Sequence, residues 1–255
     1  MKKLLALILA ALLALSLVAC GNDTDTDEGT DSESQTETVV DTEDETTGDD
    51  TADDVKVMTY DEYAAAALES AVVIEAYVQA TQSWWDNKIT VYAQDENGGY
   101  FIYNLTCSEE DSAKLVPGTK IRVSGYKAEW SGEVEIIDAT FEIVEGNWIA
   151  TAEDVTALLG TDDLIKHQNK LVAFKGMTVE KVEYKNGTPG DDIYVTVSKD
   201  GASYDFCVEF YLTGTDTDVY KAVGELKAGD VVDVEGFLYW YNGVNTHITA
   251  VSAAK

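Results

Sequence analysis

Residues 115–139 read LVPGTKIRVSGYKAEWSGEVEIIDA, and residues 226–250 read LKAGDVVDVEGFLYWYNGVNTHITA. The two stretches align without a gap at an offset of 111 residues. A self-match at a fixed offset indicates two copies of one structural unit. The shared glycines mark turns and the shared aliphatic residues mark strands with one apolar face, so the repeat predicts two domains with one backbone shape. The identical pairs are Leu115 and Leu226, Gly118 and Gly229, Val123 and Val234, Gly125 and Gly236, Gly132 and Gly243, Ile137 and Ile248, and Ala139 and Ala250.

Around each copy, apolar and polar residues alternate in the pattern of half-buried strands. The first copy is expected to have strands at 72–80, 88–94, 100–105, 120–127 and 133–144, with a short helix at 108–115 and an alanine-rich helix at 60–70. The second copy is expected to have strands at 170–182, 192–199, 203–212, 230–239 and 244–253, with a helix near 216–224. A helix at 151–160 and a turn at 162–168 are expected between the copies.

Three strands, a helix and two strands follow one another in the order of an OB-fold, a five-stranded Greek-key barrel. The sequence therefore predicts a chain dominated by β-structure, with two tandem OB-fold-like five-stranded barrels and short helices. We expect the first barrel and its N-terminal helix in residues 56–147, and the second barrel and its helical segment in residues 148–255.

The first nineteen residues have the composition of a signal peptide. Lys2 and Lys3 precede a sixteen-residue apolar run, which at ~1.5 Å per residue is too short for a ~30 Å hydrocarbon core. The run ends in Leu17-Val18-Ala19-Cys20, which resembles a bacterial lipobox. That resemblance implies cleavage before Cys20, a lipid on its sulfur, and a protein anchored on the outer face of the cell membrane.

An acidic tether is expected at residues 20–55. Residues 21–54 contain fifteen carboxylates and no Lys or Arg, so burial could not offset the entropy of ordering them, and we expect disorder. Outside the tether and the signal segment, the chain contains 33 carboxylates and 15 Lys or Arg residues, a formal charge near −18. Because nonspecific nucleic-acid binding depends on Lys and Arg contacts with phosphates, this charge ranks nucleic acid as an unlikely partner.

The sequence shows no catalytic or metal-binding motif, and neither enzymatic activity nor a cofactor is expected. His167 and His247 are the two histidines, and no GxSxG, HExxH, P-loop or GxGxxG pattern occurs. Cys107 and Cys207 occupy non-equivalent positions in the two copies, which favours free thiols over a bridge. No Cys/His spacing suits a metal ion.

Aromatic residues gather where OB-folds bind ligands, on the second and third strands and on the loops joining strands one to two and four to five. One alternative is that a tryptophan closes the barrel end and Trp130 packs on it. The third strand can be read in two registers that differ by one residue. One places Tyr103 on the ligand-binding face, and the other places Tyr100 there. The candidate ligand-binding residues are Trp84, Trp85, Asp86, Tyr92, Tyr103 and Trp130 in the first copy, and Tyr239, Trp240 and Tyr241 in the second.

The chain resembles the tandem OB-fold lipoproteins of Gram-positive bacteria over residues 59–251, most specifically in YVQATQSWWDNK at 77–88 and in the turn at 125–132. The resemblance implies a fold and a location on the cell surface, and it does not imply an activity. The expected function is therefore a surface-anchored module that binds a glycan or peptide through an aromatic rim on the first barrel. An adaptor lipoprotein that contacts other envelope proteins is the alternative, and nucleic-acid binding ranks below both. The oligomeric state stays open.

Overall fold

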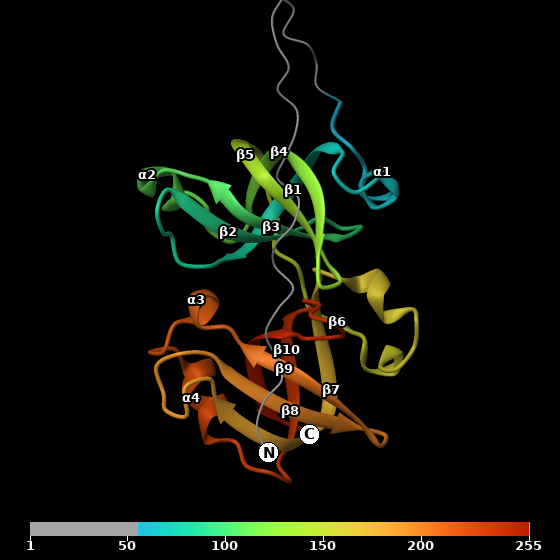
Figure 1. Cartoon of the computed structure of the whole chain (residues 1–255), viewed down its shortest axis with the longest axis vertical. Helices are drawn as coiled ribbons and strands as arrows, with labels where there is room; N and C mark the ends of the chain where they lie inside the picture. Colours follow the sequence, from blue (N-terminus) through green and yellow to red (C-terminus); the bar gives the residue numbers. More distant parts are fainter. Residues whose placement is uncertain (1–55, 255) are drawn as a thin grey trace, which may run out of the picture. The chain divides into compact units, whose positions relative to one another are not determined.

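The computed structural model describes residues 56–254 (Figure 1). The expected signal segment (1–19), the lipidation site Cys20 and the tether (20–55) lie outside the described residues. Within the described part, no helix is both long and apolar enough to span a membrane.

The first barrel is closed, with strand order β1-β2-β3-β5-β4. All neighbouring pairs are antiparallel except β3 and β5, which run parallel. A capping box formed by Thr59 and Glu62 starts its helix α1. Its elements are α1 (Tyr60–Ala65), β1 (Ala71–Thr81), β2 (Lys88–Gln94), β3 (Gly99–Thr106), α2 (Glu109–Ser112), β4 (Thr119–Trp130) and β5 (Glu133–Asn147).

The second copy forms a six-stranded sheet in the order β10-β11-β9-β8-β7-β6, and a further pairing of β10 with β7 closes five of these strands into a ring (Figure 1). The short strand β6 runs parallel to the start of β7. The strands are β6 (Glu153–Asp154), β7 (Leu171–Tyr184), β8 (Ile193–Lys199), β9 (Ala202–Val208), β10 (Val231–Phe237) and β11 (His247–Ala253). The helices are 3₁₀ turns at Thr156–Leu158 and Leu164–His167, α3 (Phe210–Thr213) and α4 (Asp218–Glu225).

The predicted fold class is confirmed, and all ten predicted strands form, β2 with the predicted bounds and the others with shifted ends. The helix expected at 60–70 is shorter, ending at Ala65. The helix expected at 151–160 is wrong: its backbone forms β6 and a 3₁₀ turn, because Val155 donates its amide hydrogen to Ala173 of β7. The strand expected at 203–212 ends at Val208, where Glu209 caps the unexpected helix α3.

Equivalent glycines of the repeat have equivalent roles. Gly118 and Gly229 adopt φ of 94° and 95°, and each donates its amide hydrogen to the first strand of its own barrel over 2.8 Å. Gly125 and Gly236 lie at a bulge between the last two strands, where a Cβ atom would come within 2.8 Å or less of a backbone carbonyl oxygen. The repeat is thus a repeat of backbone geometry, as the sequence predicts.

Each barrel has its own hydrophobic core. The alternating residues Ile89, Val91 and Ala93 all lie in the first core, and Ile193, Val195 and Val197 lie in the second, as predicted. A third buried cluster joins the barrels and consists of Tyr92, Phe101 and Phe237, with Leu171 and Tyr239 packed against it. We call this set the interbarrel cluster.

Candidate ligand-binding cleft

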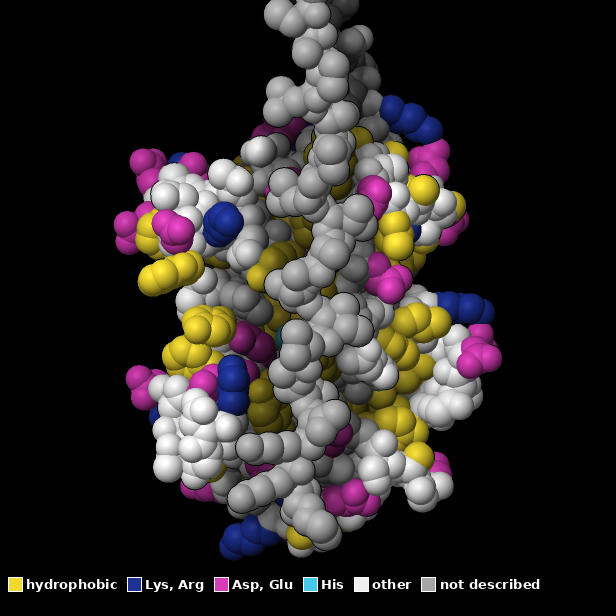
Figure 2. Space-filling model, in the orientation of Figure 1, with side chains coloured by type: hydrophobic (Ala, Val, Ile, Leu, Met, Phe, Trp, Pro, Cys, Tyr) yellow, Lys and Arg dark blue, Asp and Glu magenta, His cyan; other side chains and the backbone are white. Residues whose placement is uncertain are grey.

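A cleft of about 540 Å³ lies where the β1–β2 loop and strands β2 and β3 of the first barrel meet α3 of the second. Three aromatic side chains in its lining are strongly exposed: Trp85 at 78%, Tyr103 at 45% and Tyr211 at 54%. Hydrophobic side chains are visible around α3 in Figure 2. The lining residues are Gln82, Ser83, Trp84, Trp85, Lys88, Ile89, Thr90, Tyr103, Asn104, Phe210 and Tyr211.

A tight turn holds Trp85 in place. Asp86 and Asn87 both have positive φ, at 47° and 58°, and two 2.9 Å backbone hydrogen bonds between Trp85 and Lys88 close the turn. Two successive residues with positive φ characterise the type I′ turn, and Asp and Asn tolerate this conformation better than most residues. The loop therefore presents the Trp85 indole to solvent on a constrained backbone.

The cleft is less acidic than the rest of the molecule. Its lining, within the part of the chain that the structure describes, contains one cation, Lys88, and no carboxylate. Carboxylates are spread over other parts of the surface (Figure 2). The net charge of the chain is therefore a poor guide to the electrostatics of this site.

Helix α3 forms the wall from the second barrel and is fixed to both barrels. Asp192 Oδ1 accepts the Phe210 amide hydrogen over 2.9 Å, and Glu209 Oε2 accepts that of Leu212 over 2.7 Å. On the other side, the Ser83 backbone amide donates to the Tyr211 carbonyl oxygen over 2.7 Å. The last contact links residues 128 positions apart and joins the barrels at the cleft.

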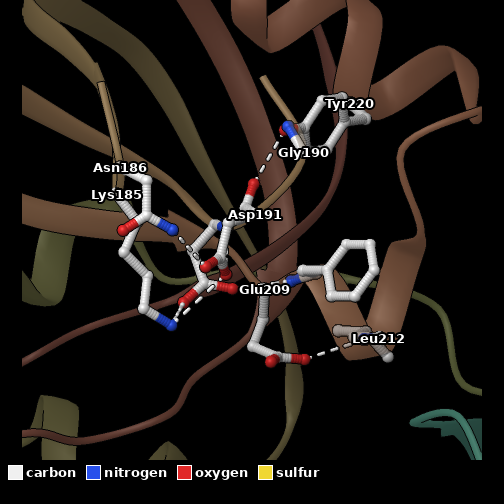
Figure 3. Close-up of polar contacts among 9 residues, drawn as sticks. Lys185, Asn186, Gly190, Asp191, Glu209, Leu212 and Tyr220 are labelled. Atoms are coloured by element: carbon white, nitrogen blue, oxygen red, sulfur yellow. Dashed lines mark hydrogen bonds and ion pairs between the residues drawn. The ribbon is translucent and has the colours of Figure 1, made fainter. Parts of the chain in front are cut away.

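Figure 3 shows the polar support behind α3, where Lys185 and Asn186 point toward Asp191 while Glu209 points toward Leu212. Lys185 also binds Asp192 over 3.0 Å. Burial, reinforced by the nearby Asp192 charge, raises the pKa of Glu209 to about 7. Its carboxyl group is consequently partly protonated at neutral pH, which reduces the negative charge behind the cleft.

Some of the predicted ligand-binding residues lie at the cleft. Trp85 and Tyr103 are exposed there, whereas Trp84 is half-buried against the first core and donates its indole N–H to the Cys107 carbonyl oxygen over 2.8 Å. Asp86 belongs to the turn beside it. The open register of the third strand resolves in favour of Tyr103, because Tyr100 is buried in the core.

The remaining predicted residues lie elsewhere. Trp130 is exposed at the far end of the first barrel and packs on Tyr241, with 5.2 Å between ring centroids. Trp240 packs on the second core. Tyr92 and Tyr239 belong to the interbarrel cluster, where Tyr92 is 1% exposed.

The strand register explains why Trp130 and Trp85 do not share a rim. Lys88, which pairs with Trp85, faces Thr106 at the end of β3. Glu133, which pairs with Trp130, lies near the start of β3, because Phe101 faces Glu135 in the parallel β3–β5 ladder. Trp85, in the β1–β2 loop, and Trp130, at the end of β4, therefore lie near opposite ends of β3.

Sequence reasoning missed the contribution of the second barrel to this cleft. Phe210 and Tyr211 belong to a segment that reads as a continuing strand, so no local signal marks them as ligand-facing. Cys107 and Cys207 are free, as the sequence favours, and the structure shows that both are buried. Among residues 56–254, no group of three or more His, Cys, Asp or Glu side chains is arranged to hold a metal ion.

No protein-family model and no curated protein matches the chain. Solved structures similar to it include a murine DNA-binding protein bound with double-stranded DNA, at 11% identity and TM-score 0.37, covering 72% of this chain and 96% of that one. The Ifi202 HINa domain with a 20-bp double-stranded DNA is 12% identical with TM-score 0.35, covering 73% and 100%. A Replication Protein A heterotrimer bound to single-stranded DNA is 12% identical with TM-score 0.31, covering 73% and 49%.

The ligand expected from the sequence differs from the ligands of these similar structures. The sequence analysis favours a glycan or peptide, with an adaptor role as the alternative, and ranks nucleic acid as unlikely. The similar structures named above contain DNA, a ligand that this ranking does not favour. The ranking needs correction because it relied on the net charge of the folded part, near −18, whereas the described lining of the cleft carries one cation and no carboxylate.

Proposed function

We propose that the two barrels form a non-catalytic module that binds a short segment of single-stranded nucleic acid in the cleft by stacking its bases. The observation that carries this proposal is the set of three exposed aromatic side chains, Trp85, Tyr103 and Tyr211, in a lining without carboxylates. Stacking of a base on an aromatic side chain contributes about 1–3 kcal/mol and tolerates any base. A duplex keeps its bases stacked on one another, so a single strand suits the cleft better.

The acidic body favours a short ligand. A long strand would pass carboxylates outside the cleft, where phosphates are repelled, and only Lys88 offers a cation in the described lining. Binding then depends on stacking more than on counterion release. Its affinity should stay level or rise as salt screens the repulsion, opposite to the fall that is typical of basic DNA-binding proteins.

Fluorescence anisotropy of a labelled short single strand, titrated with the full chain at several salt concentrations, tests this proposal. Trp85→Ala should weaken binding by about tenfold, since it removes one stacking surface. Trp130→Ala is the matched control, because Trp130 is also exposed but lies at the end of β4, near the opposite end of β3 from Trp85. Absence of binding by the parent chain, or equal effects of the two substitutions, would overturn the proposal.

We also propose that the chain is lipid-anchored through Cys20 on the outer face of the cell membrane. The lipobox-like sequence Leu17-Val18-Ala19-Cys20, which follows an apolar run, supports this location. A nucleic-acid ligand would in that case be met outside the cytoplasm.

A further inference from the structure

The edge of strand β3 that lines the cleft contains an extra residue. Ile89 of β2 faces Leu105 and Val91 faces Ile102, so the single residue Thr90 lies opposite two residues, Tyr103 and Asn104. This two-against-one arrangement is a β-bulge, a feature that re-aims side chains and is frequent beside functional sites.

The bulge changes which side chains face the ligand. Successive residues of a regular strand point to opposite faces, so Tyr103 and Asn104 should be separated by the sheet. Here Ile102 and Leu105 both point into the first core, and the two residues between them both line the cleft. An aromatic ring and a carboxamide are thereby brought to the same face by consecutive residues.

Asn104 combines an anchored backbone with a side chain that makes no hydrogen bond among the described residues. Its φ is 51°, in the left-handed region, and its backbone amide donates to Thr90 Oγ1 over 3.2 Å. Within residues 56–254, no hydrogen bond holds its half-buried side-chain amide. The backbone is anchored while the carboxamide, one acceptor beside one donor group, is free for a ligand.

We propose that Asn104 determines base preference in the cleft by pairing its carboxamide with the edge of an adenine stacked beside it, an inference that rests on the proposed function. Asparagine pairs with adenine through two parallel hydrogen bonds, one accepted from the 6-amino group and one donated to a ring nitrogen. The Tyr103 ring on the same face supplies a stacking surface, and a purine covers more of that surface than a pyrimidine does. Adenine therefore forms both hydrogen bonds with the Asn104 carboxamide and stacks on the Tyr103 ring.

The test compares short single strands of deoxyadenosine with strands of the purine deoxynucleoside that lacks the 6-amino group. The full chain should bind the adenine strand about tenfold more tightly, because the purine ring stacks equally well but has lost one hydrogen bond. The informative variant is Asn104→Gly, which removes the amide and keeps the left-handed backbone without strain. It should bind both strands with equal affinity, and no more tightly than the parent binds the strand without the amino group, because the hydrogen bond to the ring nitrogen is also lost.

The matched control is Asn242→Gly, since Asn242 also has a positive φ of 55° but lies in the β10–β11 connection outside the cleft. It should retain the tenfold preference. If Asn104→Gly keeps the preference for the adenine strand, or weakens the binding of both strands by the same factor, the role of Asn104 is overturned. The proposed function by base stacking is not affected by that result. Failure of the parent to bind either strand would instead overturn the proposed function.

Discussion

The phenol oxygen of Tyr92 in β2 lies 2.7 Å from Nδ1 of His247 in β11, so a buried hydrogen bond joins the two barrels. The Gln82 amide donates to the same oxygen over 3.3 Å, which leaves the phenol hydrogen directed at the imidazole. Burial lowers the pKa of His247 to about 3, so the ring stays neutral and can accept that hydrogen. The Tyr239 ring stacks on the imidazole, with 4.2 Å between centroids.

Removing the Tyr92 hydroxyl should therefore destabilise the two-barrel unit. Tyr92→Phe leaves Nδ1 of His247 buried without a partner, which costs roughly 1–3 kcal/mol. The free energy of unfolding in urea measures the loss. Tyr194→Phe is the matched control, because Tyr194 is 42% exposed, and it should change stability by less than about 0.5 kcal/mol. Equal effects of the two substitutions would show that the buried bond contributes nothing.

The buried carboxyl group of Glu133 should make the stability of the protein fall as pH rises toward 8. Its fully buried carboxyl group accepts hydrogen bonds from the Trp240 amide over 2.8 Å and from Gln168 over 3.0 Å, and its other oxygen has no partner among the described residues. Burial raises its pKa to about 8. Between its ordinary value and 8, the folded protein holds a proton that the unfolded chain releases, so the free energy of unfolding falls as pH rises through this window.

The substitution Glu133→Gln removes this titration. Urea unfolding as a function of pH should show that the parent loses stability, on the order of a few kcal/mol, as pH rises to about 8, while the variant loses less, because only Glu209, whose pKa is raised to about 7, still contributes strongly in this window. Glu129→Gln alters an exposed carboxylate at the end of β4 and should leave the parent profile unchanged. A parent profile that is level over this window would contradict the assignment to Glu133.

Lys127 should be needed to hold the end of helix α1. Its buried ammonium group donates to the carbonyl oxygens of Tyr63, Ala64 and Ala66 over 3.0, 2.8 and 2.9 Å. Lys127→Met keeps much of the side-chain length but leaves these acceptors unpaired, with a cost of roughly 1–3 kcal/mol. Hydrogen exchange should accelerate in α1 and the residues that follow it. Lys166→Met, at an exposed site, should leave exchange in α1 unchanged.

Two glycines of the second barrel should differ sharply in their tolerance of alanine. At Gly236, a Cβ atom would lie 2.2 Å from the His247 backbone oxygen, whereas at Gly229 nothing lies within 4 Å, and only the φ of 95° is unfavourable. Gly229→Ala should therefore cost about 1 kcal/mol, and Gly236→Ala several times more, because backbone must move. Thermal unfolding of both variants gives the ranking, and a reversed order would contradict the close approach of β10 and β11.

The lipid anchor is a prediction from the sequence that lies outside the described residues. Growth of the source cells with labelled fatty acid should place label on the parent protein and leave Cys20→Ser unlabelled. Lack of label on the parent would disprove the anchor and would leave the cleft, in residues 82–211, unaffected.

Local sequence patterns predicted most of the backbone. Alternation at Ile89, Val91 and Ala93 identified the core face of β2, and Ser108 caps α2 through the Asp111 amide as expected. The segment at 151–160 failed because its helical composition competes with a long-range ladder to β7, and such pairing overrides local propensity. The bulge at Asn104 also depends on a partner strand, so its positive φ could not be seen in the sequence.

The repeat, the two barrels and the aromatic character of their loops follow from the sequence alone, because periodicity, turn residues and self-similarity are local properties. Which aromatic residues remain available to a ligand was decided by tertiary structure. Trp130 and Tyr241 occupy equivalent positions of the repeat and pack on each other, Tyr92 is covered by the second barrel, and Tyr211 is brought to Trp85 across more than a hundred residues. Strand register and the docking of one barrel on the other fix these contacts, and both depend on chain segments far apart in sequence.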